Sequence, residues 1–306
     1  MQVFSAMLNQ MLVLFIFMAV GFFLNKKKLL PQNDSTVLSK LETYIFVPCL
    51  VFGTFQKYCT VENFTQKWTY ILYGAGIMAA SLLIGVPLAR AFAKSDLYLR
   101  KIYTYSFAVA NFSFMGNAVV LGVFGEEILF DYMMFTLPMT FYVYSYGTAS
   151  LKPTTAKFSF KMFLNPICIS MLLGALFGLL NIPLPSFLGS AVSSASACMS
   201  PLAMLLTGCV IGDYSLKKLA KDKKIYLASV LRLIVIPLIF IMILRLIKTD
   251  TAIIRVALCA VAMPLGLNTV VFPAAYGGDT TPGASMALIS HLMSVITIPI
   301  MFALLL

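Results

Sequence analysis

The chain has 306 residues, of which 60% are hydrophobic and 11% charged, and it carries a net charge of +11. A soluble domain has roughly 45–50% apolar and about 25% charged residues, so this composition excludes an ordinary soluble protein. The basic residues lie in short clusters between long apolar runs, which is typical of membrane loops and argues against nucleic acid as a partner.

Apolar runs long enough to cross a bilayer recur along the whole chain. A transmembrane helix needs about 20 mostly apolar residues. By this rule the sequence predicts an all-α polytopic membrane protein with ten spans. In chain order they lie near residues 4–24, 35–56, 68–92, 102–123, 128–149, 162–181, 193–212, 224–247, 253–276 and 282–305. The first run lacks a small-residue cleavage site, so we interpret it as a span and not as a signal peptide.

The distribution of charge between the loops predicts an orientation. Lys and Arg gather in the loops after spans 1, 3, 5 and 7, whereas the loops after spans 4 and 9 hold Glu126, Glu127 and Asp279. By the positive-inside rule the odd-numbered loops are cytoplasmic, and both termini then face outside.

The two halves of the chain share a pattern. Pro48 in span 2 corresponds to Pro201 in span 7, and a polar break followed by Asn117 in span 4 corresponds to one before Asn268 in span 9. Five spans per copy make the second copy enter from the opposite side, which is the inverted repeat of many secondary transporters. We therefore predict a first repeat over 1–149, a cytoplasmic hinge over 150–161 and a second, inverted repeat over 162–306.

Spans 4 and 9 carry the candidate binding residues, because both are interrupted by polar residues, glycine or proline. A broken backbone within lipid is tolerated only where it is buried in protein or lines a cavity. Half-helices that begin there offer free N–H groups and a positive dipole end to an anion. The same residue types also bind membrane helices to one another, but their matched positions favour a binding site. The candidates are Asn111, Ser113, Gly116, Asn117, Pro264, Gly266, Asn268 and Thr269.

Three ionisable residues inside spans are candidates for ion or proton coupling. His291 could carry a proton or could be a neutral ring bonded to a backbone carbonyl. Arg232 could pair with a solute carboxylate or extend toward the cytoplasmic lysines. Glu42 could couple transport to an ion, pair with Lys40 or lie at the membrane interface. Neither broken span holds a carboxylate, so no strong sodium site is evident, and coupling to protons or sodium stays open.

The six cysteines form no C-x-x-C pair, and the chain has one histidine. No metal site and no cofactor are therefore predicted, and the cysteines are expected to be small packing residues.

Four segments together resemble the auxin efflux carrier family, which has plant and bacterial members. They are FVPCL at 46–50, NFSFMG at 111–116, PLAMLLTG at 201–208 and MPLGLN at 263–268. The resemblance implies a ten-helix fold like that of the bile acid/sodium symporters, in which spans 4 and 9 cross at their breaks. It also implies elevator-like alternating access and carboxylate-bearing solutes, such as malate or malonate in bacterial relatives.

Carried onto this chain, the resemblance implies particular solute contacts. They are Asn111, Asn117, Asn268 and the backbone around Gly116 and Gly266, with Pro264 shaping the second break. Members of the family usually have a proline near position 118, where this chain has Ala118, so the first break is expected to be gentler. The short basic hinge resembles that of a bacterial member and suggests a bacterial plasma membrane.

We therefore expect a secondary transporter of a small organic anion in contact with membrane lipid, with a homodimer as a candidate assembly. The alternative is a solute sensor built on a carrier fold. A channel would lack saturable, exchange-sensitive flux. An intramembrane enzyme is disfavoured, because the spans hold no aspartate pair or zinc motif, and His291 is accompanied by no nucleophile motif.

Overall fold

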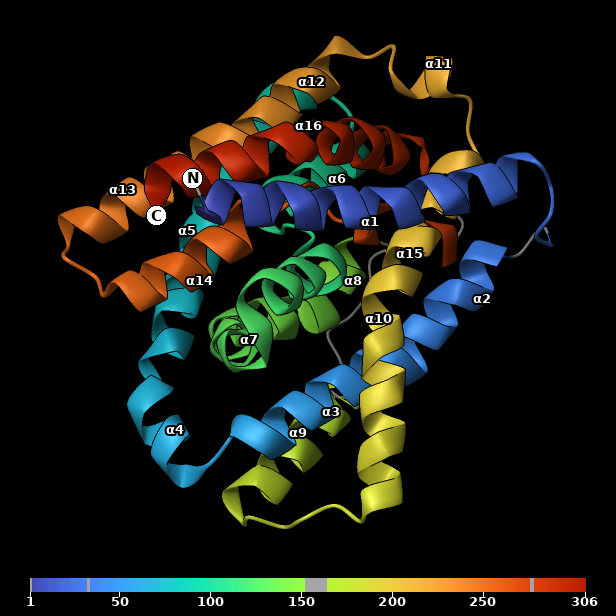
Figure 1. Ribbon diagram of the computed structural model, residues 1–306. Helices are drawn as coiled ribbons and strands as arrows, with labels where there is room; N and C mark the ends of the chain where they lie inside the picture. Colours follow the sequence, from blue (N-terminus) through green and yellow to red (C-terminus); the bar gives the residue numbers. More distant parts are fainter. Residues whose placement is uncertain (1, 32–33, 152–163, 276–277) are drawn as a thin grey trace.

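The computed structural model describes residues 2–31, 34–151, 164–275 and 278–306 (Figure 1). Over these ranges the regular structure is helical, and the only β pairing is a single isolated bridge. The first half contains α1 (Gln2–Lys26), α2 (Asp34–Leu41), α3 (Val47–Tyr58), α4 (Val61–Lys67), α5 (Thr69–Phe92), α6 (Leu97–Ala108), α7 (Asn117–Tyr142) and α8 (Thr148–Ser150). The second half contains α9 (Pro166–Leu179), α10 (Ser186–Gly212), α11 (Leu216–Leu219), α12 (Lys223–Val230), α13 (Ile236–Leu246), α14 (Thr251–Val261), α15 (Asn268–Ala275) and α16 (Thr281–Leu305).

In the described part of the chain, four wider, π-helical turns join some of these helices into longer rods. They are η1 (Glu42–Phe46), η2 (Phe112–Gly116), η3 (Val143–Gly147) and η5 (Leu231–Val235). In η1 the N–H of Val47 bonds to the carbonyl of Glu42, and in η5 the N–H of Ile236 bonds to the carbonyl of Leu231. The next residue is a proline in both cases. A proline clashes with the turn before it, and a wider turn gives its ring room without ending the helix.

Six helical stretches in the described part of the chain are long and apolar enough to cross a membrane, so this is a multi-pass membrane protein. They are Gln2–Lys26, Asp34–Tyr58, Thr69–Phe92, Ser186–Gly212, Lys223–Leu246 and Thr281–Leu305. Pro166–Leu179 and Thr251–Val261 are shorter apolar helices. The other predicted spans are interrupted, joined at a kink or only partly described, so the count of ten stays a prediction.

The boundary between predicted spans 4 and 5 lies at a sharp kink within α7. Gly125 has a positive φ of 83° there, a conformation that glycine adopts without a steric penalty. Most of the predicted hinge, residues 152–161, lies outside the described residues, and so does the predicted start of span 6.

Helices α1 and α10 pack with their backbones in direct contact. A Cβ at Gly208 would collide with the carbonyl oxygen of Met18, and a Cβ at Gly21 would collide with that of Leu205. Small residues allow this close approach between membrane helices. Gly21 meets Leu205 and, further along both helices, Asn25 meets Gly212, so α1 and α10 run parallel. Figure 1 shows α1 also running beside α16, with the two chain ends close together.

Candidate functional site

Two interrupted helices meet in the interior. After α6 ends at Ala108 the chain leaves the helical conformation until η2 begins, and a second interruption separates α14 from α15. Ala110 and Leu265 form an antiparallel bridge between these extended segments. The N–H of Asn111 donates to the carbonyl of Pro264 over 2.8 Å. Backbone groups in the two interruptions have no partner in their own helices. They bond to each other across the crossing, because buried polar groups need partners.

Helix α16 supports both interruptions through two consecutive residues. The hydroxyl of Ser290 accepts from the N–H of Leu265 at 3.1 Å, and Asn111 lies 3.2 Å from Nε2 of His291. Nδ1 of His291 lies 2.7 Å from the carbonyl of Ala287. A carbonyl only accepts, so Nδ1 carries a proton and Nε2 of the neutral ring accepts from Asn111. The ring is thus bonded to a backbone carbonyl, one of the two arrangements expected for it.

Arg232 closes the end of a half-helix. Its guanidinium donates from Nη1 to the carbonyl of Val261, the last residue of α14, over 3.1 Å. A cation at a helix C-terminus bonds to an unpaired carbonyl and offsets the negative dipole end. Only 2% of Arg232 is exposed. The expectation that it extends toward the cytoplasmic lysines is therefore wrong, because the interrupted helix provides a buried acceptor.

Gly116 is helical and does not form the first interruption. Its φ of −62° and ψ of −48° belong to the right-handed helix, and the extended segment comes earlier, before η2. A Cβ at Gly116 would collide with the hydroxyl of Tyr132. That hydroxyl donates to the carbonyl of Phe112 over 2.8 Å, so it satisfies a backbone group beside the interruption. Gly116 therefore provides the space that this tyrosine occupies.

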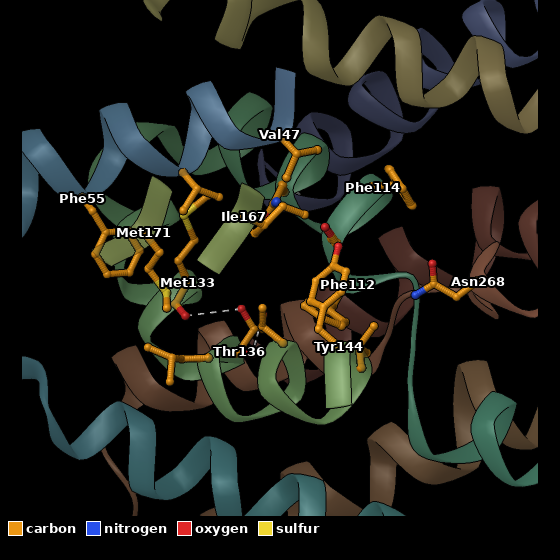
Figure 2. Close-up of a pocket in the computed structure, with 16 residues that line it drawn as sticks. Val47, Phe55, Phe112, Phe114, Met133, Thr136, Tyr144, Ile167, Met171 and Asn268 are labelled. Carbon is orange, nitrogen blue, oxygen red and sulfur yellow. Dashed lines mark hydrogen bonds between the residues drawn. The ribbon is translucent and has the colours of Figure 1, made fainter. Parts of the chain in front are cut away.

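A narrow cavity of about 40 Å³ lies beside the crossing, between α3, α7, α9 and η2. Figure 2 shows Asn268 at one end of it, with its amide directed toward Phe112, and Phe55 and Met171 at the other end. Among the candidates from the sequence, Ser113, Asn117 and Asn268 line this cavity. Its polar lining residues are Ser113, Asn117, Thr136, Thr140, Tyr144 and Asn268.

The polar groups of the cavity differ in whether they are already bonded. Asn268 donates from its amide to the hydroxyl of Tyr105 over 2.7 Å. Thr136 and Thr140 donate to carbonyls of their own helix, α7. The structure describes no hydrogen bond from the side chain of Asn117, although only 5% of this residue is exposed. Of the two asparagines that line the cavity, Asn117 is therefore the one whose side-chain amide is free to bind a solute.

The start of η2 borders the same cavity. The first N–H groups of a helix have no partner within it. Asn111 precedes η2 and does not cap it, because its side chain bonds to His291. Phe112 and Ser113, the first two residues of η2, line the cavity. No aspartate or glutamate is among the described residues that line it, so these donors face no fixed negative charge there.

The remaining candidates lie in the crossing itself. Pro264 accepts the bond from Asn111, and Gly266 lies against Ala110, whose carbonyl oxygen would be 3.5 Å from an added Cβ. Thr269 is fully buried and donates from its hydroxyl to the carbonyl of Gly266 over 3.0 Å. These three residues belong to the crossing and do not line the cavity.

Glu42 lies apart from the crossing, in η1. None of its surface is exposed, and neither of its carboxyl oxygens has a hydrogen-bond partner among the described residues. Lys40 is exposed and forms no described ion pair with it. The expectation of a pair with Lys40 is therefore wrong, whereas a place at the membrane interface stays a prediction.

Sequence reasoning missed three buried polar residues, of which the two tyrosines contact the site. Tyr105 and Tyr132 bond to Asn268 and to the first interruption, and no pattern in the sequence pairs them with these positions. Asp131 is buried near the start of the second part of α7 and forms an ion pair of 2.7 Å with Lys67. Asp131 is the one acidic residue of the predicted span 128–149, and this position could have identified it.

The comparisons with known proteins agree with this architecture. A family model described as "Membrane transport protein" matches residues 6–302, which is nearly the whole chain and includes both interrupted helices. No curated protein matches the chain.

Proposed function

The chain belongs to the membrane transport protein family, the family of the auxin efflux carriers, and from this premise we propose that it is a secondary carrier of a small organic anion. The family is one of transporters and not of enzymes. We propose in addition a plasma membrane location, ten spans in two inverted repeats, and a carboxylate as the group that is recognised.

The observation that carries the proposal is the free amide of Asn117 beside the uncapped start of η2. A carboxylate needs several donors at once, and amide side chains together with first-turn N–H groups provide them. The charges around the crossing favour an anion as well. Arg232 offsets the negative end of α14, whereas the positive end of η2 faces the cavity without a neighbouring carboxylate.

The size of the cavity supports a mechanism in which the site changes shape. Sites for small molecules usually enclose about 300–1,000 Å³. The cavity at the crossing has about 40 Å³, which is too little for a dicarboxylate. The proposed carrier must therefore widen the site to load its solute, and elevator-like alternating access provides such a change by moving the crossing against α3 and α9.

Transport by the purified protein tests this function. Proteoliposomes are given labelled malate, malonate or indole-3-acetate under imposed pH, sodium and voltage gradients. We expect saturable uptake of at least one carboxylate, stimulated by the unlabelled solute on the opposite side. Asn117→Ala is expected to reduce this uptake strongly.

The control is Asn63→Ala, which changes an amide that bonds to the carbonyl of Tyr58 near α4, away from the cavity. It should leave uptake unchanged. Equal uptake by wild type and Asn117→Ala would contradict the proposed site. Binding of the same solutes without any flux would instead indicate the sensor.

A further inference from the structure

Glu42 is a buried carboxyl group that the proposed solute site does not use. It is the first residue of η1, none of its surface is exposed, and both of its oxygens lack a hydrogen-bond partner among the described residues. The other two ionisable candidates, His291 and Arg232, both have bonded partners. Nε of Arg232 lacks a partner too, but among the described residues Glu42 is the one of the three whose side chain forms no hydrogen bond at all.

No charged side chain of the neighbouring helices compensates Glu42. Helices α2, α3, α9 and α10 pack against η1. Their titratable residues are Asp34, Lys40, Cys49, Lys57, Tyr58, Cys168, Cys198 and Cys209. Lys57 forms an ion pair with Glu126, and Asp34 accepts from Asn25. Lys40 is two positions before Glu42, a spacing that places side chains on different faces of a helix.

This environment determines the charge of the group. An ionised carboxylate that is buried without a partner is disfavoured, because it has lost its hydration and gained no compensating charge or hydrogen bond. Binding a proton removes the charge, and buried carboxyl groups respond in this way. In the conformation described here Glu42 is therefore the neutral acid, which requires one proton from the aqueous phase.

The backbone connects Glu42 to the wall of the solute cavity. The carbonyl of Glu42 accepts from the N–H of Val47, and Val47 and Val51 line the cavity. Ile167 of α9 lines the same cavity, and α9 packs against η1. A change that exposes Glu42 to water must therefore move residues that touch the solute.

We propose that Glu42 is a proton-binding site that carries one proton in each transport cycle. The carboxylate takes up a proton from water on one side, is buried as the neutral acid when the cavity narrows, and releases the proton on the other side when the surroundings of η1 open. No other bond forms or breaks. The inference rests on the proposed carrier function, since proton binding drives transport only if solute moves.

Two measurements on the variant Glu42→Gln test the proposal. Glutamine matches the neutral acid in size but cannot exchange a proton. In proteoliposomes we expect a pH gradient to drive accumulation of labelled malonate, malate or indole-3-acetate by the wild type. In Glu42→Gln this accumulation should fall to the level seen without a gradient, while exchange at equal pH continues. Glu62→Gln, an exposed glutamate of α4, is the control and should behave as wild type.

The second measurement does not depend on solute. Infrared spectroscopy of the wild type should show the carbonyl band of a protonated carboxyl group, and this band should be missing in Glu42→Gln. If no solute is transported, the proposed function fails and the infrared result still decides the state of Glu42. Identical carboxyl bands in the two proteins, or full accumulation by Glu42→Gln under the gradient, would overturn the proposal.

Discussion

Asn111 donates its side-chain amide to Nε2 of His291 over 3.2 Å, and both residues are buried. Ser290, the residue before His291, accepts the backbone N–H of Leu265 in the other interruption. Two consecutive residues of α16 therefore hold two extended segments that are far apart in the sequence. This arrangement shows that Asn111 supports the crossing. Its expected contact with the solute stays a prediction.

A double-mutant cycle should detect the bond between Asn111 and His291. Either alanine variant leaves a buried polar group without its partner, which costs about 1–3 kcal/mol. We expect Asn111→Ala and His291→Ala together to be less destabilising than the sum of the two, by about 0.5–3 kcal/mol. Reversible unfolding in detergent measures these free energies. Additive effects within about 0.5 kcal/mol would show that the pair contributes no coupling.

The two asparagines of the cavity should differ in their effect on stability. Asn117 has no described side-chain bond, so Asn117→Ala should change the free energy of unfolding by about 0.5 kcal/mol or less while weakening malonate binding about 10- to 100-fold. Asn268→Ala should weaken binding and also destabilise the protein by about 1–3 kcal/mol, because the hydroxyl of Tyr105 loses its donor. Isothermal titration and thermal unfolding separate the two effects. Equal destabilisation by both changes would contradict this assignment.

Two arginines bond to carbonyl groups at the C-terminal ends of helices, one in the interior and one near the surface, so their contributions to stability can be compared. Arg232 bonds to the carbonyl of Val261 in the interior, and Arg245 bonds to the carbonyl of Leu305 near the end of α16. Arg232→Gln should lower the free energy of unfolding by about 1.5–3 kcal/mol, the value of a hydrogen bond from a charged group. Arg245→Gln should lower it by about 0.3–1 kcal/mol. The same unfolding assay applies, and the reverse order would exclude a capping role for Arg232.

Two glycines of α10 test the contact with α1. The Cβ in Gly208→Ala would meet the backbone of Met18, which cannot rotate away, so the helices must separate and about 1–3 kcal/mol should be lost. Gly189 has nothing within 4 Å of its Cβ position. Gly189→Ala should therefore be neutral or stabilising by about 0.5–1 kcal/mol, because alanine favours the helix. Thermal unfolding of both variants decides the matter, and a stable Gly208→Ala protein would refute the close packing.

Continuous apolar length was enough to predict the uninterrupted helices. The run at 282–305 became α16, and the run at 4–24 became α1, since most residues in these segments are apolar and neither helix is interrupted. The second interruption was also visible, because Pro264 and Gly266 mark it directly. Sequence reasoning therefore located one of the two extended segments and the residues that border the cavity from both.

The first interruption could not be placed from its own residues. Val109 and Ala110 carry no helix-breaking signal, and they are extended because they pair with the segment around Leu265, 155 residues away in number. The polar residues after them suggested a break at Gly116 instead. The partners Tyr105 and Tyr132 were missed for the same reason, since the crossing alone brings them to Asn268 and Phe112.

The wider turns before Pro48 and Pro237 change how each helix must be mapped onto its faces. An α-helix turns by about 100° per residue, so a turn that holds one more residue rotates every later side chain by about that angle. A helical wheel drawn through η1 with a constant period therefore assigns Val47 and Val51 to the wrong side relative to the residues before Glu42. Comparisons of related chains by helix face should restart their count at each of these prolines.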